Sequence, residues 1–187
     1  SDGIIRVNGL KNKVLKARIP SLGDQKITFI QKGLLLHVQG PVREPVGYDS
    51  VVELEVEGEV QAENGFCGEI NFGGIQMGQA KAVLTGGVER ATGTDVTGVG
   101  YISPTSIRKW NSMNSRASWK VYMPEEGERE LTICYSCDSL SAGQPYWVEV
   151  EGAGMIEAKT LAGPKGFEEF YTRHLGKVKF PHTGIYT

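Results

Sequence analysis

The residue with most potential for binding chemistry is a tryptophan followed by two carboxylates in the segment 145–151. Side chains alternate across a strand, so Trp147 shares one face with Glu149 and Glu151. The opposite face is apolar and carries Tyr146, Val148 and Val150. An indole outside the core can stack on a sugar ring while carboxylates accept hydrogen bonds from its hydroxyls. Alternatively, Trp147 packs against another part of the chain, and the sequence leaves both interpretations open.

The three cysteines, Cys67, Cys134 and Cys137, are an odd count, which does not indicate a disulfide framework. Cys134 and Cys137 form a Cys-x-x-Cys motif, which suggests a redox or zinc site. On one strand, however, they point to opposite faces with Cα atoms ~10 Å apart, beyond the ~7 Å that a disulfide spans. We therefore interpret the cysteines as isolated residues packed in a sheet.

The other acidic residues and histidines that could form a metal or catalytic site do not have the spacing of one. Glu53, Glu55 and Glu57 share one strand face, which is typical of a solvated face that discourages edge-to-edge pairing, rather than of a metal or catalytic cluster. The three histidines, His37, His174 and His182, show no ligand spacing. We predict no metal site and no cofactor.

Composition excludes several classes of partner. The chain has 187 residues, with 22 acidic and 20 basic side chains and a formal net charge of −2. That balance provides no basic footprint for nucleic acid or an anionic membrane. No apolar run approaches the ~18 residues of a membrane-spanning helix, and no signal peptide opens the chain. The start at Ser1 suggests a fragment, so the missing signal says nothing about compartment.

Alternating runs separated by turns rich in glycine and proline predict an all-β protein. In residues 1–60 we expect strands at 4–8, 13–19, 26–31, 33–38 and 51–58, forming a partial antiparallel β-sandwich. Residues 61–78 then form a linker or covering loop, which contains a short strand at 69–72. In residues 79–187 we expect strands at 79–85, 98–102, 117–123, 129–137, 145–151, 155–161, 168–174, 176–180 and from 185 onward.

We expect 117–123 and 129–137 to pair as an antiparallel hairpin, because the intervening Pro124-Glu125-Glu126-Gly127 has the chemistry of a hairpin turn. Because side chains alternate between the two faces of a strand, Trp119 is expected on the apolar face of the first strand and Tyr122 on the polar face. Short strands at this spacing favour a sandwich or jelly roll.

Both blocks resemble a known family. Residues 12–17 (NKVLKA), 34–38 (LLLHV) and 51–58 (VVELEVEG) resemble the strands that follow the barrel in family 29 α-L-fucosidases. The second block resembles the galactose-binding-like jelly-roll module, akin to family 6 carbohydrate-binding modules, that some of those enzymes carry last. The matching residues are 98–101, Trp110, Asn111, Ser118, Trp119, Tyr135, Tyr146, Val148, Val150, 166–170, Leu175, Gly176, Val178, Gly184 and Tyr186.

This resemblance implies a non-catalytic C-terminal region of an α-L-fucosidase-like glycoside hydrolase. Its partners would be the catalytic domain of the parent enzyme and a glycan, and its location periplasmic or extracellular. A retaining hydrolase places two carboxylates ~5 Å apart, and this family does so on a (β/α)₈ barrel, for which the chain has no strand–helix pattern. We therefore expect no activity from the chain alone. The alternatives are a purely structural domain pair and a cell-surface adhesion module, neither of which binds sugar.

In modules of this kind, loops at one end of the sandwich often hold the ligand. The resemblance therefore suggests a second cluster of Tyr101, Arg108, Trp110 and Asn111, although Trp110 equally suits a structural plug at the loop base. Calcium-binding members use acidic residues in the first and last strands. Because Glu89 suits the first position poorly, we predict no calcium.

Overall fold

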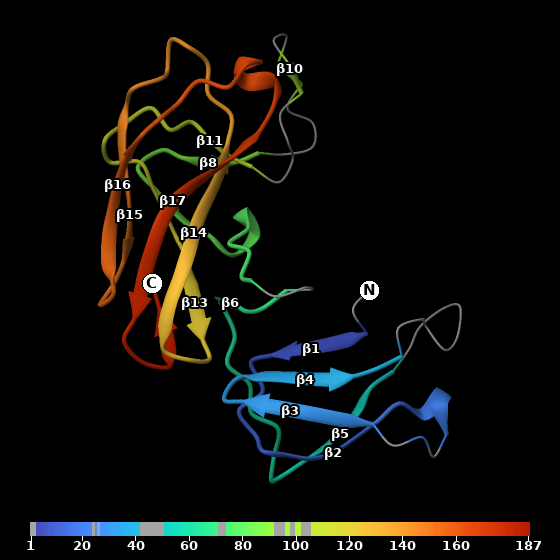
Figure 1. The fold of residues 1–187 in the computed structure, drawn as a ribbon. Helices are drawn as coiled ribbons and strands as arrows, with labels where there is room; N and C mark the ends of the chain where they lie inside the picture. The colour runs from blue at the N-terminus through green and yellow to red at the C-terminus, as the bar shows by residue number, and fades with distance from the viewer. Residues whose placement is uncertain are drawn as a thin grey trace. The chain divides into compact units, whose positions relative to one another are not determined.

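The computed structural model describes residues 3–23, 25, 27–41, 51–70, 74–91, 96–97, 100–101 and 106–187. The all-β prediction is confirmed: the chain forms several small, mostly antiparallel sheets, and the helical segments in the described ranges are three short 3-10 turns (Figure 1). None of the helices in these ranges is long and apolar enough to cross a membrane.

The chain divides into two compact units. Unit 1 comprises residues 1–76 and 120–124, and unit 2 comprises residues 77–119 and 125–187. The segment 120–124, which we expected in the second block, therefore belongs to unit 1. The assignment of 1–60, 61–78 and 79–187 as sandwich, linker and module stays a prediction.

Unit 1 is a small two-layer sandwich. One layer is the antiparallel sheet β1–β4–β3 and the other is the pair β2–β5. Its elements are β1 (Ile4–Asn8), β2 (Val14–Arg18), η1 (Pro20–Leu22), β3 (Thr28–Lys32), β4 (Leu35–Gln39), β5 (Glu53–Val56), β6 (Phe66–Cys67) and β13 (Lys120–Met123).

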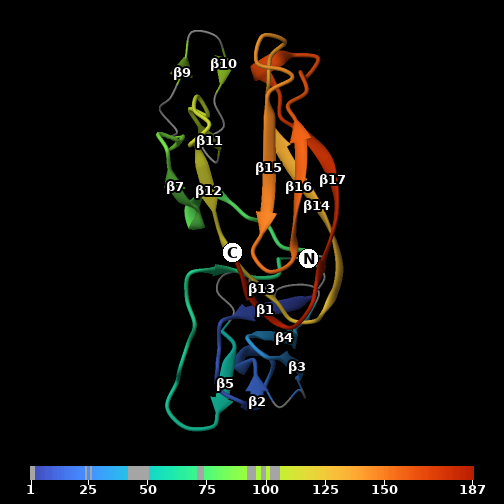
Figure 2. The same ribbon diagram turned by 90° about the vertical axis from the view of Figure 1, so that its left-hand side faces the viewer.

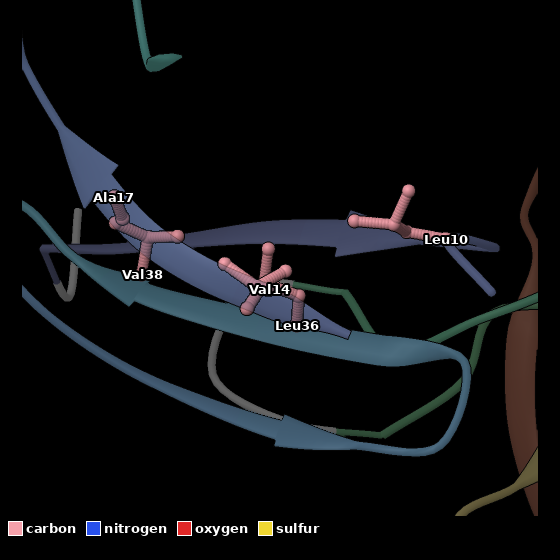
Figure 3. Close-up of a cluster of buried hydrophobic side chains, with 5 residues drawn as sticks. All are labelled: Leu10, Val14, Ala17, Leu36 and Val38. Atoms are coloured by element: carbon pink, nitrogen blue, oxygen red, sulfur yellow. The ribbon is translucent and has the colours of Figure 1, made fainter. Parts of the chain in front are cut away.

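Alternation in β4 and a bulge in β2 together explain the core of unit 1. Val14 and Ala17 of β2 pack against Leu36 and Val38 of β4, and Leu10 closes one end (Figure 3). A register shift between Val14 and Lys16 marks a bulge in β2.

A second cluster joins β13 to the rest of unit 1. β13 pairs in parallel with β6, and Tyr122 packs against Phe66 and Leu35. Tyr122 is only 5% exposed, and its hydroxyl accepts the backbone N–H of Leu34 at 3.3 Å. The expectation that Tyr122 lies on a polar face is therefore wrong, because a partner far away in the sequence buries it.

Unit 2 contains the longer strands. Its elements are η2 (Gln79–Lys81), β7 (Val83–Thr85), β8 (Glu89–Arg90), β9 (Val96–Thr97), β10 (Gly100–Tyr101), β11 (Ile107–Arg108), β12 (Arg116–Ser118), β14 (Gly127–Tyr135), β15 (Pro145–Val150), β16 (Gly154–Lys159), η3 (Gly166–Glu168), β17 (Tyr171–Phe180) and β18 (Gly184–Tyr186).

Two antiparallel pairs, β14–β17 and β15–β16, dominate unit 2 (Figure 2). They lie against each other through contacts of β16 with β17, and the rings of Tyr135 and Tyr146 meet edge to face at 6.2 Å. The strands expected at 168–174 and 176–180 are one strand, β17, with a register shift beside Gly176. Sequence periodicity missed the two-residue strands β6, β8, β9 and β11.

The predicted hairpin of 117–123 with 129–137 is wrong. The first segment is interrupted at Trp119, and β12 pairs with β7 while β13 pairs with β6. β14 pairs instead with β17 over its whole length of 9 residues. A ladder of this length outweighs the local preference of the Pro124–Gly127 turn, because each cross-strand pair adds its own contribution.

Candidate functional site

The candidate site is the exposed face of the β15–β16 hairpin, hereafter the hairpin face. Across the two strands Trp147 lies opposite Glu157, Glu149 opposite Met155, and Pro145 opposite Lys159. All six residues are exposed, whereas the residues that alternate with them in each strand are half-buried, apart from the exposed Gly154 at the start of β16. Because directly opposite residues of an antiparallel pair project to the same side, these three pairs form one continuous surface.

The local sequence explains why this surface forms. Tyr146, Val148 and Val150 bury the other side of β15 toward the interior of unit 2. Burial raises the pKa of the Tyr146 hydroxyl, and the neighbouring Tyr135 raises it further. Gly152 and Gly154 adopt positive φ angles and let the chain reverse, and the turn is closed by the N–H of Ala153, which donates to the Val150 carbonyl at 2.9 Å.

The structure unites only part of the first predicted cluster. Trp147 and Glu149 share the hairpin face, but β15 ends at Val150 and Glu151 begins the turn. The backbone N–H of Glu151 donates to the Thr187 carbonyl at 3.0 Å. In place of Glu151, strand β16 contributes three side chains to the hairpin face that sequence reasoning missed, namely Met155, Glu157 and Lys159. Extending the register through the 152–154 turn would have found them.

The indole N–H groups distinguish the three tryptophans. Trp110 donates to the Ile107 carbonyl at 3.0 Å, and Trp119 donates to the Gly78 carbonyl at 2.9 Å. Trp147 makes no such bond within the described ranges, and it is 42% exposed. Nor do the side chains of Glu149 and Glu157 have ion-pair or hydrogen-bond partners among the described residues. The donor and the two acceptors are thus available to a ligand.

The second predicted cluster is organised differently. β11 pairs with β8, so Arg108 lies opposite Glu89, whose carboxylate also binds the Lys109 ammonium at 2.8 Å. The hydrogen bond from Lys109 lowers the pKa of Glu89. Trp110 is 53% exposed, with its N–H turned back to the chain.

Asn111 is exposed, and its backbone N–H donates to the Lys109 carbonyl at 2.9 Å. The side chain of Tyr101 lies outside the described residues. The strand pair β8–β11 and the hairpin β15–β16 belong to separate sheets, so no strand pairing joins the two predicted clusters.

Other candidates do not form sites. In the described ranges, no group of three or more His, Cys, Asp or Glu side chains could hold a metal ion. The acidic row of β5 is exposed as expected, and β2 places Lys16 opposite Glu55 and Arg18 opposite Glu53. None of the three cysteines, all of which lie among the described residues, forms a disulfide, and Cys134 is exposed while the other two are buried.

A hollow of about 380 Å³ lies at the turn end of the hairpin face. It is lined by Glu149, Val150, Gly152, Ala153, Gly154 and Met155. A Cβ atom added at Gly152 or at Gly154 would meet nothing within 4 Å, so this end of the hairpin is open.

Comparison with known proteins gives one structural similarity. No protein-family model matches the chain, and no curated protein matches it. The crystal structure of an α-L-fucosidase from Vibrio sp. strain EJY3 is similar over 99% of this chain, with 14% sequence identity and a TM-score of 0.47. The chain spans 30% of the length of that protein. Similarity at this level assigns neither a family nor an activity to the chain.

Proposed function

We propose that the chain is a non-catalytic β-sandwich region of an α-L-fucosidase-like glycoside hydrolase, and that its unit 2 is a jelly-roll module that binds glycan on the hairpin face. The sequence motifs of both blocks support the first part. The second part rests on Trp147, the one tryptophan whose indole N–H has no protein partner in the described ranges.

The chemistry of the hairpin face suits a sugar. The apolar face of a pyranose stacks on an indole, and its hydroxyls need polar partners at the rim. Glu149 on the same strand and Glu157 on the next are both exposed and can accept hydrogen bonds from hydroxyls. The surface is shallow and buries little of a small sugar, so we expect weak, millimolar binding.

The chain by itself is proposed to have no hydrolase activity. Its partner is then the catalytic domain of the parent enzyme, and its location is periplasmic or extracellular. A second candidate function, a structural support without sugar binding, is favoured by Trp110, because its bond to the Ile107 carbonyl suits a plug at a loop base.

The experiment is a glycan array followed by titration calorimetry on the full chain, which avoids cutting unit 1 away from residues 120–124. Trp147→Ala is compared with Trp110→Ala, a matched control that removes an exposed indole, somewhat more exposed than Trp147, from the other cluster. We expect Trp147→Ala to weaken binding at least tenfold, or about 1.4 kcal/mol, and Trp110→Ala to leave it unchanged.

Circular dichroism establishes that each variant is folded. Binding that survives in Trp147→Ala and disappears in Trp110→Ala would move the site to the β8–β11 loop. Absence of binding to any fucosylated or galactosylated glycan at millimolar concentration would reject glycan binding and support the structural role.

A further inference from the structure

We infer that the glycan site extends from Trp147 along β15 into the hollow at the turn, and that it takes a neutral glycan of at least two sugar residues. This inference rests on the proposed function, because it presumes that Trp147 stacks on a sugar. It adds a second subsite and a charge preference to that proposal.

The spacing of the hairpin face supports two subsites. The pair Trp147–Glu157 and the pair Glu149–Met155 are two residues apart on each strand. That separation is ~7 Å at strand rise, about the length of one sugar residue. Glu149 and Met155 also line the hollow, so the stacking platform and the hollow share one edge.

The hollow is a shallow depression that opens widely to solvent. Its volume of about 380 Å³ lies at the lower end of the ~300–1,000 Å³ of known ligand pockets. One wall is Met155, which is 55% exposed and offers an apolar surface, and another is the carboxylate of Glu149. A second sugar residue would thus meet one apolar and one hydrogen-bonding wall.

Charge sets the preference for neutral glycans. Glu149 and Glu157 face Trp147 from its own strand and from the next one, and Glu151 stands at the turn. Lys159 is the one basic residue on the hairpin face. Three carboxylates against one ammonium repel a sugar carboxylate, because like charges close together are unfavourable. Uncharged hydroxyls can donate hydrogen bonds to these carboxylates without such repulsion.

The test titrates the full chain with galactose, lactose, 2′-fucosyllactose and 3′-sialyllactose. The two trisaccharides share the lactose unit and differ in whether the added sugar is neutral or acidic. We expect affinity to rise at least tenfold from galactose to lactose or 2′-fucosyllactose. The affinity for 3′-sialyllactose should fall severalfold below that for lactose, and Glu149→Gln should reduce this gap.

Ala153→Phe fills the hollow and should remove the gain from the second sugar while leaving galactose affinity unchanged. The matched control is Thr172→Phe, which adds the same ring on the exposed side of β17. Should Ala153→Phe fail to fold, Met155→Ala serves instead, with the same expected loss.

Equal affinities for galactose and the longer neutral glycans would overturn the second subsite while leaving the proposed function standing. The second subsite would also be overturned if Ala153→Phe and Met155→Ala both kept the full increase in affinity from galactose to the longer neutral glycans. Tighter binding of 3′-sialyllactose than of lactose would overturn the charge preference. If the unmodified chain binds none of the four sugars and no other glycan, the proposed function itself fails.

Discussion

The contact between Tyr122 and the β3–β4 turn makes a prediction about coupled stability. The Tyr122 hydroxyl accepts the Leu34 N–H at 3.3 Å, and it lies only 2.0 Å from where a Cβ atom on Gly33 would stand. Tyr122→Phe keeps the ring but leaves that partly buried N–H without an acceptor. We expect a loss of about 1 kcal/mol, at the lower end for an unsatisfied donor because the bond is long.

Gly33→Ala should cost considerably more. Gly33 has a φ of 55°, a region in which an L-residue loses roughly 1–2 kcal/mol. The new methyl group also collides with the Tyr122 hydroxyl. In Tyr122→Phe that oxygen is absent, and the nearest ring atom, Cζ, lies 3.2 Å away. The double variant should therefore lose less free energy of unfolding than the two single variants lose together, and the difference should be about 1 kcal/mol or more.

Urea denaturation followed by circular dichroism measures the four free energies of unfolding. Hydrogen exchange at the Leu34 amide reports the bond directly, because Tyr122→Phe should accelerate exchange there and leave the core amides of β14 unaffected. Losses that add within ~0.5 kcal/mol would mean that the hydroxyl does not press on Gly33, and the packing argument would be refuted.

Three further predictions concern charges and thiols. Glu69→Gln should destabilise unit 1 by about 1–3 kcal/mol, measured by denaturation, because it removes the carboxylate charge that the buried Arg6 guanidinium binds at 3.3 Å. An unchanged midpoint would contradict this. Ellman's reagent should react rapidly with Cys134 alone in the native chain, and with all 3 cysteines after unfolding; three rapid thiols would contradict the burial of the others. The lowered pKa of Glu89 implies a contribution to stability that is present above its unfolded-state pKa and lost as pH falls through its folded-state value; acid titration of Glu89→Gln or Lys109→Met should lack this component.

The sequence by itself determined the fold class and, for strands such as β5 and β15, which side chains face away from the core. Strict alternation in β15 was enough to place Trp147 away from the core, because successive side chains project to opposite faces whatever their partners are. The same rule predicted the exposed acidic row of β5. Such features depend on local periodicity alone.

Only the tertiary structure decided which strands pair. The sequence favoured a local hairpin for β14, but a partner some forty residues later supplies a longer ladder. Parity also failed for Tyr122, because Leu34 and Phe66 bury the side that looked polar. The companions of Trp147 on β16 follow from register, and whether its indole N–H finds a partner within the described residues depends on the folded chain. Pairing, burial by distant segments and hydrogen-bond satisfaction are non-local, and those are the properties that define the candidate site.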